Sequence, residues 1–274
     1  MTTTRMPTLF LPHGGGPWTI VDVGGPQAHA PLEAYLRTMA EDLPARPSAI
    51  LCVSAHWEED VATVQTATRP PMLYDYYGFP QAAYAYTWPA PGAPDAAAAV
   101  KDHLASAGIA TAEDGQRGFD HGTFVPLMVP FPEPDIPTFQ VSLLASLDAA
   151  DHLALGRALA PLRDRGVLIV GSGMSYHNVR QLQAARRSPD EAKTLERDAR
   201  TFDDWLAESV TAEASAREQA LADWAHAPAA RPSHPREEHL LPLMVAAGAA
   251  GDDAATLPMR GRVLGAPVSA VRFG

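Results

Sequence analysis

The chain has 274 residues, of which 46% are hydrophobic and 19% are charged. A chain of this length and apolar content can bury one large core, and α/β domains of this size often remain undivided. Its formal net charge is -11, so it lacks the basic surface with which proteins neutralise the phosphates of nucleic acids. We therefore expect one domain over residues 1–274 and no nucleic-acid partner.

The N-terminal residues and the single cysteine bear on the compartment. The stretch MTTTRMPTLFLPHGGG contains no apolar run long enough for a signal sequence, and no window approaches the length of a membrane span. Cys52 lies in an apolar run and has no second cysteine to pair with, so we expect a small buried core residue. These features predict a cytoplasmic protein with no membrane partner.

Apolar, β-branched runs alternate with helical patterns along the chain. In chain order we expect a strand at 8–11, a helix at 31–41, strands at 49–54 and 61–66, a helix at 94–107, a strand at 138–143, a helix at 150–165, a strand at 167–170, a long helix at 189–210, a helix from about 236 to 246 and a strand at 267–273. This alternation predicts an α/β fold with a mostly parallel or mixed central sheet flanked by helices.

The long helix has the clearest start signal. Ser188 is its expected N-cap, Pro189 lies in its first turn and Glu191 follows three residues after the cap. Apolar residues then recur at steps of three or four, which predicts one face packed on the core. By composition, only the segment 225–235 resembles a lid or a linker.

The most informative histidines directly follow predicted strands. His13 follows the strand at 8–11, His56 follows the strand at 49–54, and His177 follows the strand at 167–170 and a Gly-Ser-Gly turn. Ligands of open α/β sheets bind at the carboxyl ends of the strands, so these side chains can converge there. Imidazole is a good ligand for Zn and Fe, and a catalytic site needs about three protein ligands with one position left open. The sequence therefore predicts an active site with a metal at this edge.

Glycines accompany two of these histidines. Residues 14–16 are all glycine, and Gly171 and Gly173 precede His177. A backbone without side chains can approach a bound ligand closely, and we interpret both glycine clusters in this way.

His121 and His239 have less decisive settings. His121 lies in a glycine-bounded loop beside Asp120, which can orient an imidazole, although neighbours in sequence usually point apart. His239 lies where a helix begins, and Glu237 and Glu238 before it are also what complementarity to the helix dipole would place there. The spacing alone leaves open whether His239 is a ligand.

The remaining histidines have weaker settings. We expect His103 and His152 at the surface or boundary of amphipathic helices, and His29 and His226 in loops. His234 is near enough to His239 to compete for its role, but Pro235 beside it favours a loop.

A series of short motifs spans nearly the whole chain. They are Leu-Pro-His-Gly-Gly-Gly at 11–16, Val-Ser-Ala-His-Trp at 53–57, Tyr-Gly-Phe-Pro at 77–80, Tyr84, Pro-Ala-Pro-Gly at 89–92, Gly-Phe-Asp-His-Gly at 118–122, Val-Ser-Leu at 141–143, Tyr-His-Asn at 176–178 and Glu-His-Leu-Leu-Pro-Leu at 238–243. In this order and at these separations, the chain resembles the class III extradiol dioxygenases, and within them the DOPA 4,5-dioxygenase-like branch.

The resemblance implies a catalytic domain that opens the ring of a catechol with O2. It implies that His13, His56 and His239 hold one divalent metal ion, and that His177 is either a further ligand or the acid/base histidine. His121 matches a second pocket histidine near the substrate.

The third ligand can be either His239 or Glu238, and the metal can be either Zn2+ or Fe2+. The wider superfamily uses two histidines and a carboxylate, whereas this branch substitutes a histidine, so Glu238 remains a fallback third ligand. Nitrogen-only ligation suits Zn2+, while ring opening with O2 calls for Fe2+.

The resemblance also suggests roles for other side chains. We expect His177 by preference, and His121 next, to take a proton from the catechol and return it later. Aromatic residues suited to a flat pocket wall are Trp18, Trp57, Tyr74, Tyr77, Phe79 and Phe124, although for many of them ordinary packing accounts for the same pattern.

Two other functions stay open. A zinc hydrolase would use the same ligands with Glu58, Glu59 or Glu238 as base, and a non-catalytic metal-binding relative would keep the fold alone. The sequence also leaves open which catechol is cleaved and the oligomeric state, a homo-oligomer included.

Overall fold

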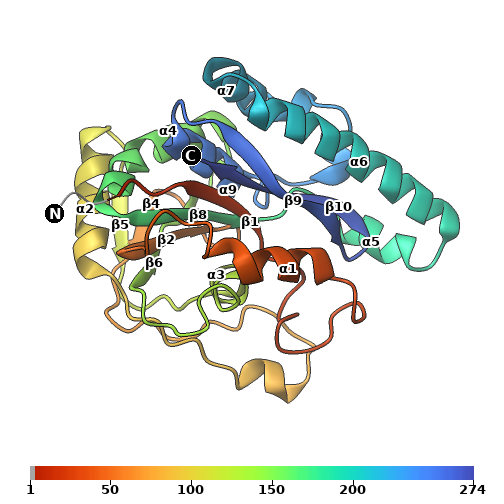
Figure 1. Ribbon diagram of the computed structural model, residues 1–274, viewed down its shortest axis with the longest axis horizontal. Helices are drawn as coiled ribbons and strands as arrows, with labels where there is room; N and C mark the ends of the chain where they lie inside the picture. Colours follow the sequence, from red (N-terminus) through yellow and green to blue (C-terminus); the bar gives the residue numbers. More distant parts are fainter. Residues whose placement is uncertain (1–3) are drawn as a thin grey trace.

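A computed structural model describes residues 4–274 and shows helices on both sides of a six-stranded mixed sheet (Figure 1). The central strands are β1 (Thr8–Pro12), β2 (Ala49–Ser54), β6 (Thr138–Gln140), β8 (Val167–Gly173), β9 (Ala255–Val263) and β10 (Ala266–Phe273). Their order is β6-β2-β8-β1-β10-β9. The first four are parallel neighbours, and β10 pairs antiparallel with both β1 and β9. The expected fold class is confirmed.

Helices cover both faces of the sheet (Figure 1). One face carries α2 (Pro94–Ser106), α4 (Ala149–Leu159), α6 (Pro189–Thr211) and α9 (Leu241–Ala250), and the other carries α1 (Ala30–Met39) and α3 (His121–Leu127). Successive residues of a strand point to opposite faces. In β1, Phe10 therefore packs with the first group of helices, while Leu9 and Leu11 pack with the second.

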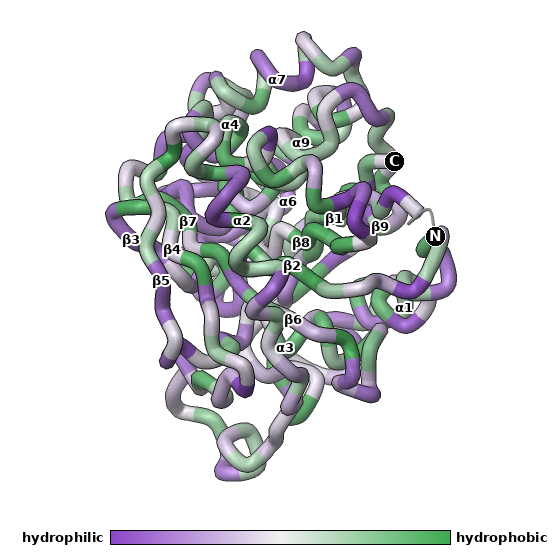
Figure 2. Tube along the Cα trace, turned by 90° about the vertical axis from the view of Figure 1, so that its left-hand side faces the viewer, coloured by the Kyte–Doolittle hydropathy of each residue, from purple (hydrophilic) through white to green (hydrophobic). Residues whose placement is uncertain are grey.

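Because both faces of the sheet are covered, the strands β1, β2 and β8 at its centre are buried along their whole length and are mostly apolar. Figure 2 shows this as green segments around β1, β2 and β8 in the middle of the molecule. Cys52 in β2 is fully buried, as its apolar surroundings predict. Within residues 4–274, no helix is long and apolar enough to cross a membrane.

Several predicted elements have different ends. The strand expected at 61–66 is β4 (Ala62–Gln65), which pairs with β5 (Thr111–Asp114) outside the central sheet. The strand expected at 138–143 divides into β6 and β7 (Leu143–Leu144), and β7 pairs with β3 (Glu58–Glu59). The helix expected at 150–165 is α4 followed by the 3-10 helix η2 (Ala160–Arg165), since Pro161 has no N–H to continue the α-helical ladder.

The long helix α6 confirms its sequence signals. The Ser188 side chain accepts a hydrogen bond from the Glu191 backbone N–H at 3.4 Å, so it is the N-cap. Leu195, Phe202 and Leu206 are buried along one face of the helix. The remaining short elements are η1 (Gln81–Tyr84), α5 (Val179–Ala185), α7 (Ala214–Ala222), η3 (Trp224–His226) and α8 (Ala230–Ser233).

The segment 225–235 is part of the packed domain, so its interpretation as a lid or linker was wrong. Ala230, Ser233 and His234 are buried, and the His234 ring lies 5.2 Å from that of Phe202 in α6. Proline and small residues here allow a tight path across α6, which composition alone cannot distinguish from a loose loop.

Glycines in β8 let the start of α9 lie directly on the sheet. A Cβ on Gly171 would be 2.1 Å from the Pro242 carbonyl oxygen, and one on Gly173 would be 2.2 Å from the His239 carbonyl oxygen. Near His13, a Cβ on Gly14 would be 2.3 Å from Trp18 Nε1. In this structure both glycine clusters make room for the protein's own chain, which differs from the expected approach to a ligand.

We predict that Gly171→Ala lowers the free energy of unfolding by about 1–3 kcal/mol, because the added methyl group meets backbone that cannot easily move. Gly115→Ala is the matched control, since its Cβ would meet only Thr66 Oγ1 at 3.6 Å. Urea denaturation of both variants measures the difference, and a Gly171→Ala variant as stable as the control would contradict the close contact.

Candidate metal centre

Three histidine rings lie close together at the carboxyl edge of the sheet. His13 follows β1, His56 follows β2, and His239 precedes α9, where its carbonyl accepts a hydrogen bond from Met174 N–H at 2.9 Å beyond the end of β8. The ring centroids are 4.9 Å apart for His13–His56, 4.9 Å for His56–His239 and 5.2 Å for His13–His239. The three rings thus form a nearly equilateral triangle, although their residues are far apart in sequence.

Each of these rings has one engaged and one unpartnered nitrogen. The Nδ1 of His13 lies 2.9 Å from the Gly14 carbonyl oxygen, and that of His239 lies 2.8 Å from Glu238 Oε1. The Nδ1 of His56 lies 3.5 Å from Asp75 Oδ2. The Nε2 atoms of all three are buried without a hydrogen-bond partner. Acceptors at Nδ1 favour a proton there and leave a lone pair on Nε2, which is the form that binds a metal ion.

Burial keeps these three imidazoles neutral. It lowers the pKa of His13 and of His56 well below the usual value, and the neighbouring histidines lower both further. Burial, followed by the charge of His177, lowers the pKa of His239 to about 3. Neutral imidazole is the metal-binding form, so the site can hold a divalent cation at neutral pH without first releasing protons from these rings.

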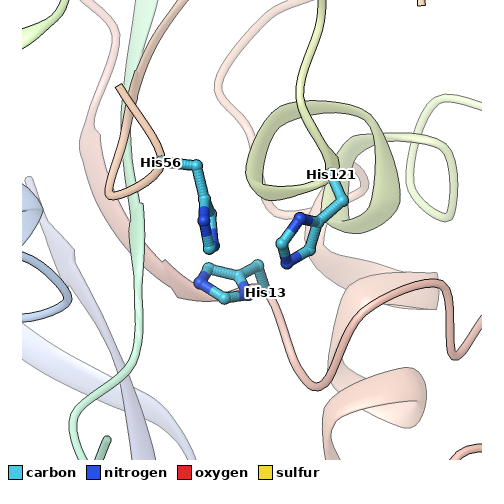
Figure 3. Close-up of side chains that lie close together, drawn as sticks. All are labelled: His13, His56 and His121. Atoms are coloured by element: carbon cyan, nitrogen blue, oxygen red, sulfur yellow. The ribbon is translucent and has the colours of Figure 1, made fainter. Parts of the chain in front are cut away.

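His121 lies beside His13 and His56 (Figure 3). It is the first residue of α3, and its ring is 4.0 Å from that of His56 and 5.3 Å from that of His13. One ligand atom from each of these three histidines lies within 4.8 Å of the others. The Nδ1 atom of His121 lies 2.8 Å from Asp75 Oδ1.

The carboxylate that orients His121 is Asp75, whereas Asp120 points elsewhere, as sequence neighbours usually do. The Asp120 side chain caps α3, accepting from Thr123 N–H at 3.0 Å, and also accepts from Ser54 Oγ at 2.7 Å. Burial by itself would raise the pKa of Asp75, but hydrogen bonds from His121 lower it overall. Asp75 therefore faces His121 as a carboxylate.

His177 stacks on His239. Their ring centroids are 3.3 Å apart at an interplanar angle of 16°, and His177 Nδ1 lies 3.5 Å from Glu238 Oε1. One ligand atom from each of His177, Glu238 and His239 lies within 4.8 Å of the others. Burial opposes ionisation of Glu238, but hydrogen bonds from His177 and His239 hold its pKa well below the usual range. Glu238 therefore contacts both rings as a carboxylate.

The other histidines contribute to packing. His152 is fully buried, which contradicts the surface or boundary position expected for it, because its ring accepts from Leu144 N–H at 3.0 Å and lies 2.6 Å from the Asp148 carbonyl. His29 is buried against Trp18 and accepts from Gly15 N–H at 3.1 Å, so it supports the loop after His13. His234 Nε2 lies 3.0 Å from the Ser175 carbonyl oxygen, so that contact engages one of its two ring nitrogens.

The aromatic residues near the site differ from those expected. Tyr77 is 92% exposed, whereas Trp57 and Phe124 are buried in the core. Tyr76, which the sequence analysis did not select, packs edge-on against His121 at 5.8 Å and against Phe79 at 5.5 Å. Adjacent residues of an extended loop point in opposite directions, and no local pattern indicated which tyrosine faces the histidines.

Two of the three carboxylates considered as hydrolytic bases, Glu58 and Glu59, are engaged by other residues. Glu58 forms a two-pronged ion pair with Arg236, at 2.5 and 2.6 Å. Glu59 accepts a hydrogen bond from Trp57 Nε1 at 2.9 Å. Both side chains are thus engaged by other residues, whereas the third candidate base, Glu238, contacts His239 and His177 within the site.

Comparisons with known proteins show the family to which this chain belongs. Residues 7–266 match the family described as the catalytic LigB subunit of aromatic ring-opening dioxygenase. The chain is 37% identical over 252 residues to a 4,5-DOPA dioxygenase extradiol of Beta vulgaris, covering 90% of this chain and 87% of that protein. It is 34% identical over 270 residues to the protein of the same name from Escherichia coli K12, covering 97% and 93% of the two chains.

A solved structure shares the fold. The crystal structure of an uncharacterized protein from Escherichia coli K12 superposes with a TM-score of 0.78 at 31% sequence identity, covering 98% of this chain and all of the other. The family match over most of the chain, the relatives and this fold agree with one another. The chain therefore belongs to the LigB family of aromatic ring-opening dioxygenases, in its class III extradiol branch.

Proposed function

We propose that residues 1–274 form one catalytic domain, which uses a single divalent metal ion and O2 to open the ring of a DOPA-like catechol. The observation that carries the proposal is the set of three buried, unpartnered Nε2 atoms of His13, His56 and His239. Two relatives named 4,5-DOPA dioxygenase extradiol support a substrate of this class.

In this proposal His13, His56 and His239 hold the ion through Nε2. A nitrogen-only donor set of three leaves coordination positions open and is compatible with Fe2+ or Zn2+. When bound, the ion would supply charge stabilisation and a template for the two catechol oxygens and O2. His177 remains a candidate fourth ligand because it stacks on His239.

The proton chemistry falls to the two histidines that flank the triangle. In both His177 and His121, Nδ1 faces a carboxylate, which favours Nε2 as the atom that accepts a catechol proton and later returns it. We favour His177 as the principal acid/base group, because its side chain is 27% exposed compared with 8% for His121. Glu238 orients His239 in this scheme, and so it is not the third ligand.

We predict that His13→Ala and His56→Ala each lose most of the bound metal and remain folded, because both residues lie at strand ends rather than inside the core. Metal content by mass spectrometry and circular dichroism test this together. His103→Ala is a control variant at a half-buried histidine of α2, and full metal occupancy in either ligand variant would reject the assignment.

We predict that the protein loaded with Fe2+ consumes O2 and forms a coloured ring-opened product from a catechol, while the Zn2+ form does neither. The physical reason is that Zn2+ has no redox chemistry. An oxygen electrode and a panel of catechols measure the difference. Equal O2 uptake with both ions, or none with Fe2+ across the panel, would count against the dioxygenase assignment.

The roles of His239 and His177 can be separated by substitution. His239→Ala should weaken metal binding at least tenfold, roughly the scale on which a metal shell is disturbed. His177→Ala should keep the metal but lose about a hundredfold or more in turnover, the usual share of acid/base catalysis. Metal titration followed by turnover at saturating metal distinguishes them. If both variants lose metal equally, four histidines hold the ion and the proton-transfer role passes to His121.

A further inference from the structure

The carboxylate of Asp75 lies between two histidines of the site. Its Oδ1 is 2.8 Å from Nδ1 of His121 and accepts the His121 backbone N–H at 3.0 Å. Its Oδ2 is 3.5 Å from Nδ1 of His56. Asp75 thus faces His56, whose Nε2 is buried and unpartnered, and His121, which we assign to proton transfer. A separate carboxylate oxygen faces each of the two rings.

The loop around Asp75 is tied down on both sides. Phe119 N–H donates to the Pro71 carbonyl and Leu73 N–H donates to the Phe119 carbonyl, each at 2.8 Å, so this loop runs beside the segment that leads to His121. The Tyr76 hydroxyl donates to the Ala83 carbonyl at 2.5 Å. These bonds hold the Asp75 carboxylate in a defined position relative to both rings.

An ionised carboxylate only accepts hydrogen bonds, so it favours an N–H on whichever ring nitrogen faces it. Both Nδ1 atoms face Asp75, and a neutral imidazole that carries its proton on Nδ1 has its lone pair on Nε2. For His56 this is the form a metal ligand needs, and for His121 it is the form a proton acceptor needs.

We propose that Asp75 is a positioning residue that sets the same ring tautomer in His56 and His121, so that both present an Nε2 lone pair to the site. The roles of these two lone pairs, in binding metal and in accepting a proton, rest on the proposed function. Glu238 differs in geometry, because a single oxygen, Oε1, lies near both His239 and His177. Only at Asp75 does each histidine have its own oxygen.

This difference makes Asp75→Asn a sharp test. An amide has one acceptor oxygen, and the two N–H groups of His121 should keep that oxygen at the Oδ1 position. The amide NH2 then faces His56 Nδ1. Because an NH2 group donates a hydrogen bond, Nδ1 must accept it with its lone pair, and the His56 ring carries its proton on Nε2 instead. We expect the affinity for Zn2+ to fall at least tenfold, roughly the loss seen when a partner of a ligating histidine is removed.

Nitrogen-15 spectra of the histidine rings in the metal-free protein read the tautomers directly. In the wild type we expect both His56 and His121 to carry the proton on Nδ1, with signals assigned from His56→Gln and His121→Gln. In Asp75→Asn we expect His56 to switch to Nε2–H while His121 does not. A purely structural role of Asp75 would alter thermal unfolding without this selective switch.

Asp135→Asn is the matched control, because it also removes one carboxylate. The Asp135 side chain is 63% exposed, and within residues 4–274 its one ion pair is with Arg46. It should keep the wild-type Zn2+ affinity and tautomers. An Nε2–H form of either histidine in the wild type, or wild-type affinity and unchanged tautomers in Asp75→Asn, would overturn the proposal. The spectra of the metal-free wild type decide the matter even if the variant does not fold or the catechol assay fails.

Discussion

The site depends on the parallel pairing of β1 and β2 with β8 between them. Parallel strands end at the same edge of a sheet, so His13 and His56 leave neighbouring strand ends in the same direction. The third ring arrives from elsewhere in the chain, on the turn before α9. Because Gly171 and Gly173 have no side chains, that turn lies directly on β8, and His239 completes the triangle. A small packing detail of one strand therefore sets the position of a ring that is distant in sequence.

Burial gives the same three rings their chemical character. An imidazolium is costly to bury, and the neighbouring rings would repel a second positive charge, so His13, His56 and His239 stay neutral. A buried nitrogen without a partner is itself unfavourable. A divalent cation would satisfy all three Nε2 atoms at once, which couples metal binding to the stability of the fold. The arrangement is consistent with a family whose members open aromatic rings.

Two carboxylates link the triangle to the histidines beside it. Asp75 faces His56 and His121, and Glu238 faces His239 and His177. Each carboxylate thus contacts one candidate ligand and one candidate acid/base group. In the proposed function, metal binding and proton transfer would therefore share the carboxylates that support them.

The sequence by itself determined the features that follow from local periodicity and from motifs. It placed β2 at its exact bounds, the start of α6 at Ser188, and His13, His56 and His177 at strand ends, because apolar runs and capping residues act over a few positions. It missed β9, an edge strand whose residues alternate between exposed and buried or half-buried, because Pro258 and Gly261 within it disfavour a strand.

Only the tertiary structure decided which side chains meet. Asp75 lies 46 residues before His121 in a loop, just outside the Tyr-Gly-Phe-Pro motif at 77–80, and that motif contains the exposed Tyr77 rather than the buried Tyr76. His152 lies on an amphipathic helix and is nevertheless buried, since its ring bonds to backbone on both sides. Such contacts depend on how distant segments pack, and the free energy of that packing is not encoded in the periodicity of any one segment.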